Sequence, residues 1–341
     1  MLKPSRVCIL FLMAVIGFGA LVYASTGTLF FVSLANAFED DDRDLGPDIL
    51  TKLGVVRATE LSETSGIARS HLYSDALWCH NDSGHSPTLY LVQFDGTVLA
   101  KSRVSKAQNA DWEDIGSFLI NGTPYLIVGD VGDNRGRRQN IAFYLMKEPT
   151  IELVKGKVVE QPIETMQKIV AVYEDGPRNC EAIGVSTASR ELFLIEKKPL
   201  GGSQQPPGIY RLDLAPFFGG QRVGPKKGFS KIRRVADLPV RNVTGMAFSD
   251  DSQKVIIRDY LAAHLMVRRA GENWPERFQR GQAKLVALPI ERQGESICFE
   301  SAGNAVITTS EFLTQPIWKV QVEDPSEKDP SEKNLEGSGR Q

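Results

Sequence analysis

Five short segments of this chain repeat one pattern, and the repeat constrains the fold more than any other feature. Each segment carries a polar residue with an oxygen acceptor, a second polar residue two positions later, and an apolar residue two positions beyond that. The segments are residues 63–67, 111–115, 179–183, 242–246 and 293–297. Because every second side chain of a strand points to the same face, each segment predicts a strand with its three repeated residues on one face.

The three repeated positions define three layers. The outer polar layer is Glu63, Asp111, Asn179, Asn242 and Gln293. The inner polar layer is Ser65, Glu113, Glu181, Thr244 and Glu295. The apolar layer is Ile67, Ile115, Ile183, Met246 and Ile297. Five such strands around one axis would place two polar rings above an apolar plug.

Each segment also opens a group of short strand-like runs that are separated by Gly, Pro, Asn and Asp turn residues. The fifth group lacks its fourth run, and the strand-like residues 52–61 can supply it, because ring closure removes exposed sheet edges. We therefore predict an all-β fold, a five-bladed β-propeller over residues 52–323 that is closed by an N-terminal strand. The repeats are longer than the roughly 40–45 residues of a WD40 blade. A pair of packed β-sheets with chance similarities is the alternative.

The two ends of the chain differ from this domain. Lys3 and Arg6 precede a long uncharged run, which contains the small-residue cleavage pattern Ala35-Asn36-Ala37. Residues 1–37 thus predict a cleaved signal peptide or, since about 20 apolar residues span a bilayer, an N-terminal membrane anchor. Both alternatives place the domain outside the cytoplasm: periplasmic, extracellular, or anchored in the cytoplasmic membrane and facing out. Residues 38–51 form an acidic linker, and the polar tail 324–341 is predicted to be disordered.

Charge and cysteine usage exclude some functions. A net charge of −2 over 341 residues gives no reason to expect a nucleic acid partner. Cys79, Cys180 and Cys298 fall in predicted strands, so they are buried free thiols or, alternatively, include a Cys180–Cys298 pair. The chain has no zinc-binding spacing of Cys and His.

The carboxylates of the two polar layers predict a cation site. Glu113, Glu181 and Glu295 would converge in a narrow channel, where carboxylates must shift their pKa, pair with protein cations or bind a metal. Oxygen-only ligands suit Ca²⁺ or Mg²⁺. We therefore predict bound calcium on these three residues, with Glu63 and Asp111 nearby. In the alternatives, the same carboxylates only tie blades together through backbone or basic donors, or two of them form a catalytic pair.

The ends of the second strands are expected at the same mouth, because the second strand of a blade returns to the face where the first begins. These ends predict a surface for a small-molecule or protein ligand. The candidate ligand-binding residues are His80, Asn81, Asp130, Glu196, Lys197, Arg258 and Glu311. No catalytic residue is assigned, since the chain has no Gly-x-Ser-x-Gly elbow, phosphate loop or dinucleotide fingerprint.

The motifs 63–66, 111–113, Ile195-Glu196-Lys197 and Thr309-Ser310-Glu311 resemble the SdiA-regulated family of exported bacterial β-propellers over residues 52–322. They are similar, more distantly, to esterase-like phytases. The first resemblance implies an exported propeller with bound calcium and no established reaction. The second implies calcium-dependent hydrolysis of phosphate esters, with Lys197 and Arg258 stabilising charge, although the chain lacks a dense basic cluster. We expect a binding protein, with a calcium-dependent phosphoesterase, or a lactonase- or lyase-like hydrolase using the same metal, as alternatives.

Overall fold

A computed structural model describes residues 20–23, 29–32, 49–218 and 229–322. The chain divides into two compact units, one ending at Leu50 and one starting at Thr51. In the first unit, β1 (Ala20–Tyr23) pairs antiparallel with β2 (Leu29–Val32). The rest of the predicted signal peptide or anchor, most of the acidic linker and the predicted disordered tail lie outside the described residues. In the ranges that are described, no helix has both the length and the apolar character needed to cross a membrane.

The second unit consists of four antiparallel-rich sheets. The first sheet contains β4 (Thr64–Arg69), β5 (Ala76–Asn81), β6 (Thr88–Gln93), β7 (Val98–Arg103) and β11 (Val159–Glu160). The second contains β8 (Trp112–Ile120), β9 (Thr123–Asp130), β10 (Ile141–Lys147), β12 (Gln167–Tyr173), β13 (Cys180–Ser186), β14 (Glu191–Glu196), β15 (Gly208–Asp213) and β16 (Ser230–Asp237). The third contains β17 (Val243–Phe248), β18 (Lys254–Asp259), β19 (Ala262–Val267) and β20 (Lys284–Ala287). The fourth contains β21 (Gly294–Phe299), β22 (Ala305–Ser310), β23 (Pro316–Gln321) and β3 (Leu50–Val55).

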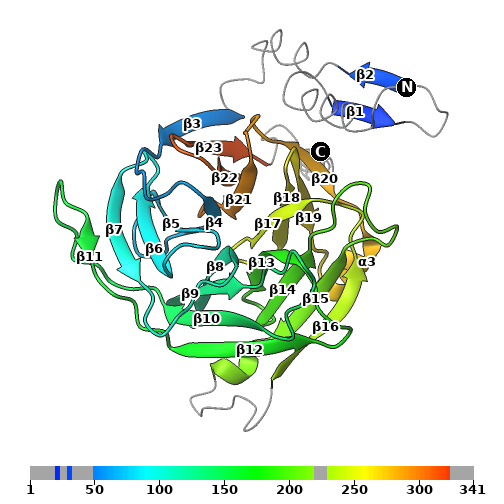
Figure 1. The fold of residues 1–341 in the computed structure, drawn as a ribbon, viewed down its shortest axis with the longest axis horizontal. Helices are drawn as coiled ribbons and strands as arrows, with labels where there is room; N and C mark the ends of the chain where they lie inside the picture. The colour runs from blue at the N-terminus through cyan, green and yellow to red at the C-terminus, as the bar shows by residue number, and fades with distance from the viewer. Residues whose placement is uncertain (1–19, 24–28, 33–48, 219–228, 323–341) are drawn as a thin grey trace, which may run out of the picture. The chain divides into compact units, whose positions relative to one another are not determined.

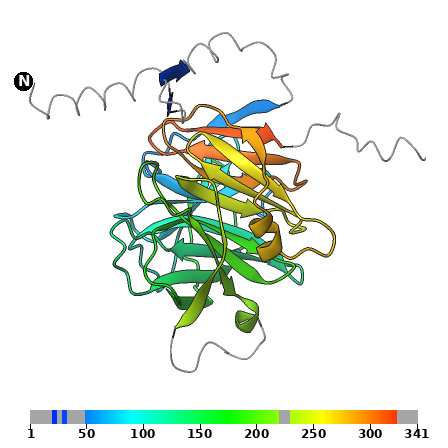
Figure 2. The ribbon, with the colours of Figure 1, turned by 90° about the vertical axis from the view of Figure 1, so that its right-hand side faces the viewer.

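The first strands of the repeats surround a common axis. They contact one another in the cyclic order β4, β8, β13, β17, β21 and back to β4. The other strands follow outward from this ring, as Figures 1 and 2 show for the second unit. The prediction of an all-β, propeller-like domain is therefore confirmed. As the sequence also predicted, the N-terminal strand β3 lies beside β23 and supplies the fourth strand of the last sheet.

One connection between strands was not predicted. The segment that follows β10, which was expected to form one outer strand of the second group, divides between two sheets. β11 pairs with β7, while β12 pairs with β10. β12 also pairs in parallel with β16, through Ala171 with Ser230 and Tyr173 with Ile232. This parallel contact joins two repeat groups into one sheet of eight strands.

The first strands do not keep the uninterrupted two-residue alternation that the sequence analysis assumed, so this part of the prediction was wrong. Each one has a shift of pairing register at the inner polar layer. The residues between the shifted pairs are Ser65, Glu113, Glu181, Thr244 and Glu295. A β-bulge leaves one residue unpaired and bends the strand, so it re-aims the side chain at that position. The five bulges thus change the direction of the five side chains of the inner polar layer, which lie at the mouth of the channel.

The apolar layer and a short helix complete the core. Ile67, Ile115, Ile183, Met246 and Ile297 are all buried. A short 3₁₀ helix, η1 (Ala215–Phe217), follows β15. The helix α3 (Trp274–Arg280), which the sequence analysis missed, begins with a capping box between Asn273 and Glu276. It packs against β16 (Figure 2) and inserts Trp274 and Phe278 into the core.

The three described cysteines are buried free thiols, which was one of the two alternatives predicted for them. Cys180 and Cys298 are therefore not paired with each other. Burial raises the pKa of the Cys180 thiol and of the Cys298 thiol to about 12. Protonated, buried thiols are unreactive, so these residues contribute packing rather than chemistry.

Candidate cation site at the channel mouth

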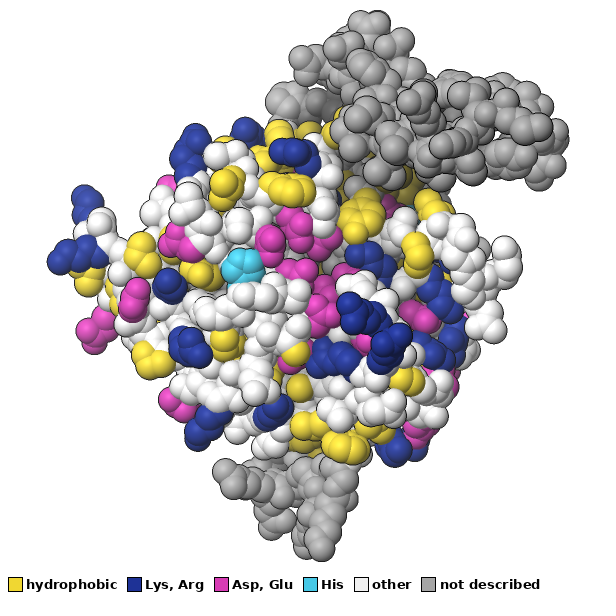
Figure 3. Space-filling view, in the orientation of Figure 1, with side chains coloured by type: hydrophobic (Ala, Val, Ile, Leu, Met, Phe, Trp, Pro, Cys, Tyr) yellow, Lys and Arg dark blue, Asp and Glu magenta, His cyan; other side chains and the backbone are white. Residues whose placement is uncertain are grey.

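Acidic side chains gather at the centre of the face seen in Figure 3. The inner polar layer contributes three of them, Glu113, Glu181 and Glu295, each no more than 5% exposed. The other two members of that layer are neutral and join neighbouring strands. Ser65 Oγ donates to the carbonyl of Glu113 at 2.6 Å, and Thr244 Oγ1 donates to the carbonyl of Gly294 at 3.2 Å. The neutral members thus join adjacent first strands through hydrogen bonds to the backbone.

Three carboxylates form the tightest group. Asp82, Asp111 and Glu113 each offer one oxygen, and these atoms all lie within 4.8 Å of one another. Asp82 follows β5 and is held by its backbone N–H, which donates to the carbonyl of Glu63 at 2.9 Å. Asp111 and Glu113 flank the start of β8. We call this group the carboxylate trio; its oxygens match the ligands that Ca²⁺ and Mg²⁺ take in proteins.

A glycine gives the trio its space. A Cβ atom at Gly132 would lie 2.1 Å from Glu113 Oε1 and 2.5 Å from Asp111 Oδ2. Any other residue at position 132 would therefore have to move one or both carboxylates. The loop that follows β9 thus approaches the trio closely. The lack of a side chain at Gly132 lets Glu113 Oε1 and Asp111 Oδ2 occupy their observed positions.

The carboxyls of the trio retain protons more readily than ordinary acids do. Burial, reinforced by Glu181 and Asp82, raises the pKa of Glu113 well above its usual value. Burial and the charges of Asp82 and Glu181 likewise raise the pKa of Asp111 to about 6. The pKa of Asp82 is raised chiefly by burial as well. Such shifts mean that the negative charges lack sufficient compensation from protein cations, which a bound metal would supply.

Glu181 and Glu295 form the other half of the mouth with one lysine. Lys197 Nζ lies 3.2 Å from a carboxylate oxygen of Glu181 and 5.1 Å from the centre of the Tyr260 ring. Although burial opposes its charge, Glu181 and Glu295 raise the pKa of Lys197. Glu295 accepts from Gln293 Nε2 at 2.9 Å and from the Tyr260 hydroxyl at 3.4 Å. This half of the mouth is a hydrogen-bonded network that contains a cation, whereas no described cation forms an ion pair with the trio.

Two more predicted acidic residues line the mouth. Glu63 is exposed, and its carboxylate lies 3.4 Å from His85 Nδ1. Glu311 follows β22, and burial together with the charges of Glu295, Asp82 and Glu63 raises the pKa of its carboxyl to about 8. In the described part of the chain, no side chain or backbone group forms an ion pair or hydrogen bond with that carboxyl. Glu311 is thus an acid at the mouth without a protein partner.

Two other candidate ligand-binding residues serve the fold beneath the mouth. His80 is fully buried, its Nδ1 lies 3.0 Å from the carbonyl of Asn81, and its ring meets Trp112 edge-on. Burial lowers the pKa of His80 to about 4, so the ring is neutral at physiological pH. The amide of Asn81 donates to the carbonyl of Glu60 at 2.6 Å and accepts from the N–H of Glu63 at 3.2 Å. The structure therefore places both polar groups in backbone contacts.

The remaining candidates are held in ion pairs. Asp130 pairs with Arg138 at 2.9 Å, and Glu196 pairs with Lys198 at 3.3 Å. Arg258 is fully buried and pairs with Glu291 at 2.5 Å. Of the two basic residues that the sequence analysis placed at the site, the structure thus brings Lys197 alone to the acidic mouth.

Two residues of the site were missing from the predicted set. One is Asp82, which directly follows β5 and the predicted residues His80 and Asn81. Asp114 is fully buried at the bulge of β8; its Oδ1 accepts from Ile115 N at 2.8 Å, and its Oδ2 accepts from Ile183 N at 2.8 Å and from Met246 N at 3.3 Å. Burial raises the pKa of Asp114 well above its usual value. A signal for it existed, because the other repeats have small residues at this position: Gly66, Ala182, Gly245 and Ser296.

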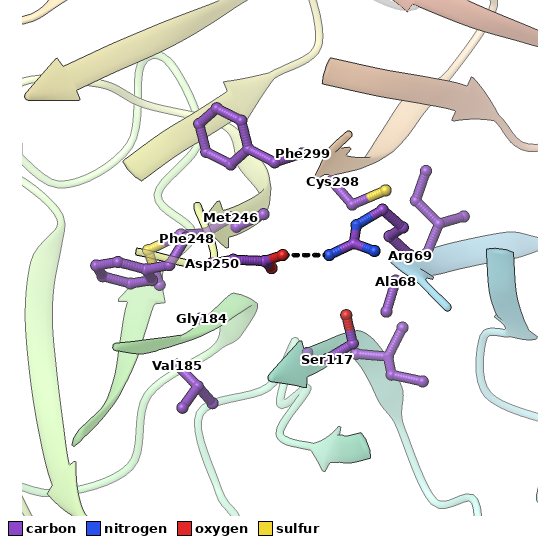
Figure 4. A pocket seen from close by; sticks show the side chains of 14 residues that line it. Ala68, Arg69, Ser117, Gly184, Val185, Met246, Phe248, Asp250, Cys298 and Phe299 are labelled. Atoms are coloured by element: carbon purple, nitrogen blue, oxygen red, sulfur yellow. Dashed lines mark hydrogen bonds and ion pairs between the residues drawn. The ribbon is translucent and has the colours of Figure 1, made fainter. Parts of the chain in front are cut away.

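Below the apolar layer, the channel opens again toward the opposite face. Figure 4 shows this lower pocket, where Arg69 from β4 reaches across to Asp250 and forms an ion pair at 2.5 Å. Met246, Cys298 and other side chains of the first strands line the walls. Residues of the apolar layer, such as Ile67 and Met246, line this pocket, so the layer lies between the lower pocket and the acidic mouth.

Comparisons with known proteins do not identify a family. No family model and no curated protein matches the chain, so the resemblance to the SdiA-regulated family stays a prediction. Among solved structures, a glucose dehydrogenase aligns at 10% sequence identity and a TM-score of 0.41, covering 80% of this chain and 99% of its own. The soluble aldose sugar dehydrogenase of Escherichia coli aligns at 12% identity and a TM-score of 0.42, with the same coverage. A nidogen/laminin complex aligns at 12% identity and a TM-score of 0.39 over 72% of each chain. Likenesses this distant carry no conclusion about activity or ligands.

Proposed function

We propose that this chain is an exported or membrane-tethered, five-bladed β-propeller that binds a divalent cation at its channel mouth and a ligand or protein on the same face. The cation that fits best is calcium. The observation that carries the proposal is the carboxylate trio, whose three oxygens lie within 4.8 Å of one another. The cyclic contacts of the five first strands support the blade count.

A cation accounts for the trio better than a purely structural role. Structural carboxylates are normally satisfied by several donors, as Asp114 is by three backbone N–H groups. In contrast, no described side chain forms an ion pair with Asp82, Asp111 or Glu113, and neighbouring acids add to the rise in the pKa of all three. Lys197, a half-buried lysine at the mouth, pairs with Glu181, outside the trio. Asp82, Asp111 and Glu113 would hold the ion, while Glu181, Glu295 and Glu63 would add negative charge around it.

Binding is a better proposal than catalysis. A phosphoesterase needs basic side chains that stabilise the charge on the transferred phosphoryl group. Lys197 is engaged by Glu181, and Arg258 is buried against Glu291. Arg138, whose charge lowers the pKa of Asp111, is held by Asp130 and by the carbonyl of Gly132. Because these three cations are engaged by other protein groups, we propose calcium as a cofactor of binding.

The test is calcium binding by the full chain, measured by isothermal titration and by the melting temperature in EDTA or Ca²⁺. A ligand at 100 times its Kd should stabilise the protein by about 2.7 kcal/mol. We expect a Ca²⁺-dependent rise that is lost in Asp82→Asn and in Glu113→Gln. Glu152→Gln, which changes an exposed acid on the connection after β10, should keep the rise. No heat of binding and no rise in the parent chain would refute the proposal.

A further inference from the structure

Exposed apolar side chains surround part of the acidic mouth. Leu200 and Leu261 are each 73% exposed, Ile290 is 72% exposed, and Leu313 and Phe312 are 53% and 41% exposed. All five lie on loops that leave second strands or enter first strands, on the face where the polar layers begin. We call these residues the apolar rim. Exposed apolar groups that gather beside polar residues mark interaction sites on soluble proteins.

Contacts connect the rim to the carboxylates. Tyr260, next to Leu261, lies under Lys197 and donates to Glu295. The guanidinium of Arg292 lies 4.9 Å from the centre of the Phe312 ring. Because Glu311 directly precedes Phe312 and Leu313, the rim and the acid without a partner share one loop.

The backbone of that loop is strained. Phe312 has a φ of 77° and Thr314 has a φ of 60°, in the left-handed region that bulky residues seldom adopt. Strained conformations of this kind gather at binding sites, where the surrounding structure holds them in place. The N–H of Phe312 donates to the carbonyl of Ser62 at 2.9 Å, which fixes the loop against the segment before β4. The loop thus exposes the Phe312 side chain although its backbone conformation is unfavourable for a bulky residue.

We infer that the apolar rim and Glu311 form a docking surface for a protein segment that presents a lysine or arginine flanked by apolar side chains. The basic group would displace the proton of the Glu311 carboxyl and pair with the resulting carboxylate at the mouth. The flanking side chains would pack on Phe312, Leu313 and their neighbours in the rim. Charge complementarity selects this occupant, since the mouth holds several acids, while Lys197 is paired with Glu181 and Arg292 lies over the Phe312 ring. The inference rests on the proposed role of this face in ligand binding, but it does not require the carboxylate trio to hold calcium.

Other occupants fit the charges less well. A second copy that docked through the same face would bring two acidic mouths together, and like charges in an interface are costly. An anionic lipid surface would also meet the carboxylates. Sedimentation would detect the second copy, and capture by vesicles would detect the lipid surface.

The test uses fluorescein-labelled peptides with a central lysine between leucine and phenylalanine residues, titrated with the full chain and followed by fluorescence polarisation. Matched peptides carry acetyl-lysine or glutamate at the centre. We expect the lysine peptide to bind about tenfold more tightly than the acetylated one, because a charge-assisted hydrogen bond is lost. Glu311→Gln should remove this preference, and Leu313→Ser should weaken all binding. Leu72→Ser, an exposed apolar change on the β4–β5 turn, is the control and should change neither.

Several results would overturn the inference. They are equal binding of the three peptides, no binding of any peptide, tighter binding of the glutamate peptide, and a Leu313→Ser variant that binds like its parent. Two further results would assign the rim to another occupant and overturn the inference. They are dimerisation in sedimentation that depends on Leu313, and capture by phosphatidylserine vesicles that depends on Leu313. The Ca²⁺-dependent melting temperature of the same samples separates the two proposals, because it can persist when peptide binding fails.

Discussion

The charge of Glu311 predicts an unusual dependence of stability on pH. The pKa of this carboxyl rises from an ordinary 4.5 to about 8. Because the folded protein holds the proton more tightly, this group stabilises the fold below the unfolded pKa, and the stability is lost as pH rises through 8. At about 1.36 kcal/mol for each pKa unit, the complete effect would be ~5 kcal/mol. Solvent screening at the mouth reduces it to about 1–2 kcal/mol.

Glu311→Gln removes the ionisation and should therefore stabilise the protein at pH 9 by that amount, with no change at pH 5. For a domain of this size, about 1 kcal/mol shifts the melting temperature by roughly 2–4 °C. The assay is thermal unfolding of parent and variant, followed by circular dichroism from pH 5 to pH 9 in EDTA. Glu152→Gln should have no effect at any pH. If Glu311→Gln destabilises the protein at pH 9, or acts equally at pH 5 and pH 9, the electrostatic account of the mouth is wrong.

Three further substitutions test the local architecture. Gly132→Ala should lower the Ca²⁺ affinity, because the added Cβ collides with the Glu113 carboxylate. The expected loss, measured by calorimetry, is about 10–100-fold, as when residues that support metal ligands are changed. Asp114→Asn should lower the free energy of unfolding in urea by about 1–3 kcal/mol, since one amide oxygen cannot satisfy three N–H donors. Asn273→Ala should cost about 1 kcal/mol in the same urea assay through loss of the N-cap of α3, and unchanged stability would contradict the capping geometry.

The repeat allowed the all-β, propeller-like domain to be predicted from the sequence, because the same alternation at several places admits few arrangements. It located the polar and apolar layers and the strand β3 that completes the last sheet. The bulges were not predictable in this way. Strand register depends on partners distant in sequence, and a one-residue irregularity at Glu113 leaves no local mark.

The site shows the same limit. Asp82 lies beside Glu113 only because the end of β5 and the bulge of β8 meet in space. Arg258 was expected at the mouth, but its pairing with Glu291 draws it inside the protein. In contrast, two features could have been predicted from the sequence. One is the special role of Asp114, which stands where the other repeats have small residues. The other is the start of α3, because Asn-x-x-Glu is a capping-box signature.

The position of β3 in the last sheet sets an order for synthesis and folding. Within the domain, β3 leaves the ribosome first, yet its partner β23 is the last of the described strands. The ring therefore closes only after β23 has been made, and such distant pairings form slowly. A chain that ends before β23 exposes the edges of both β3 and β22, and unpaired edges associate with other chains. Truncated forms of this protein are accordingly expected to aggregate rather than persist as partial propellers.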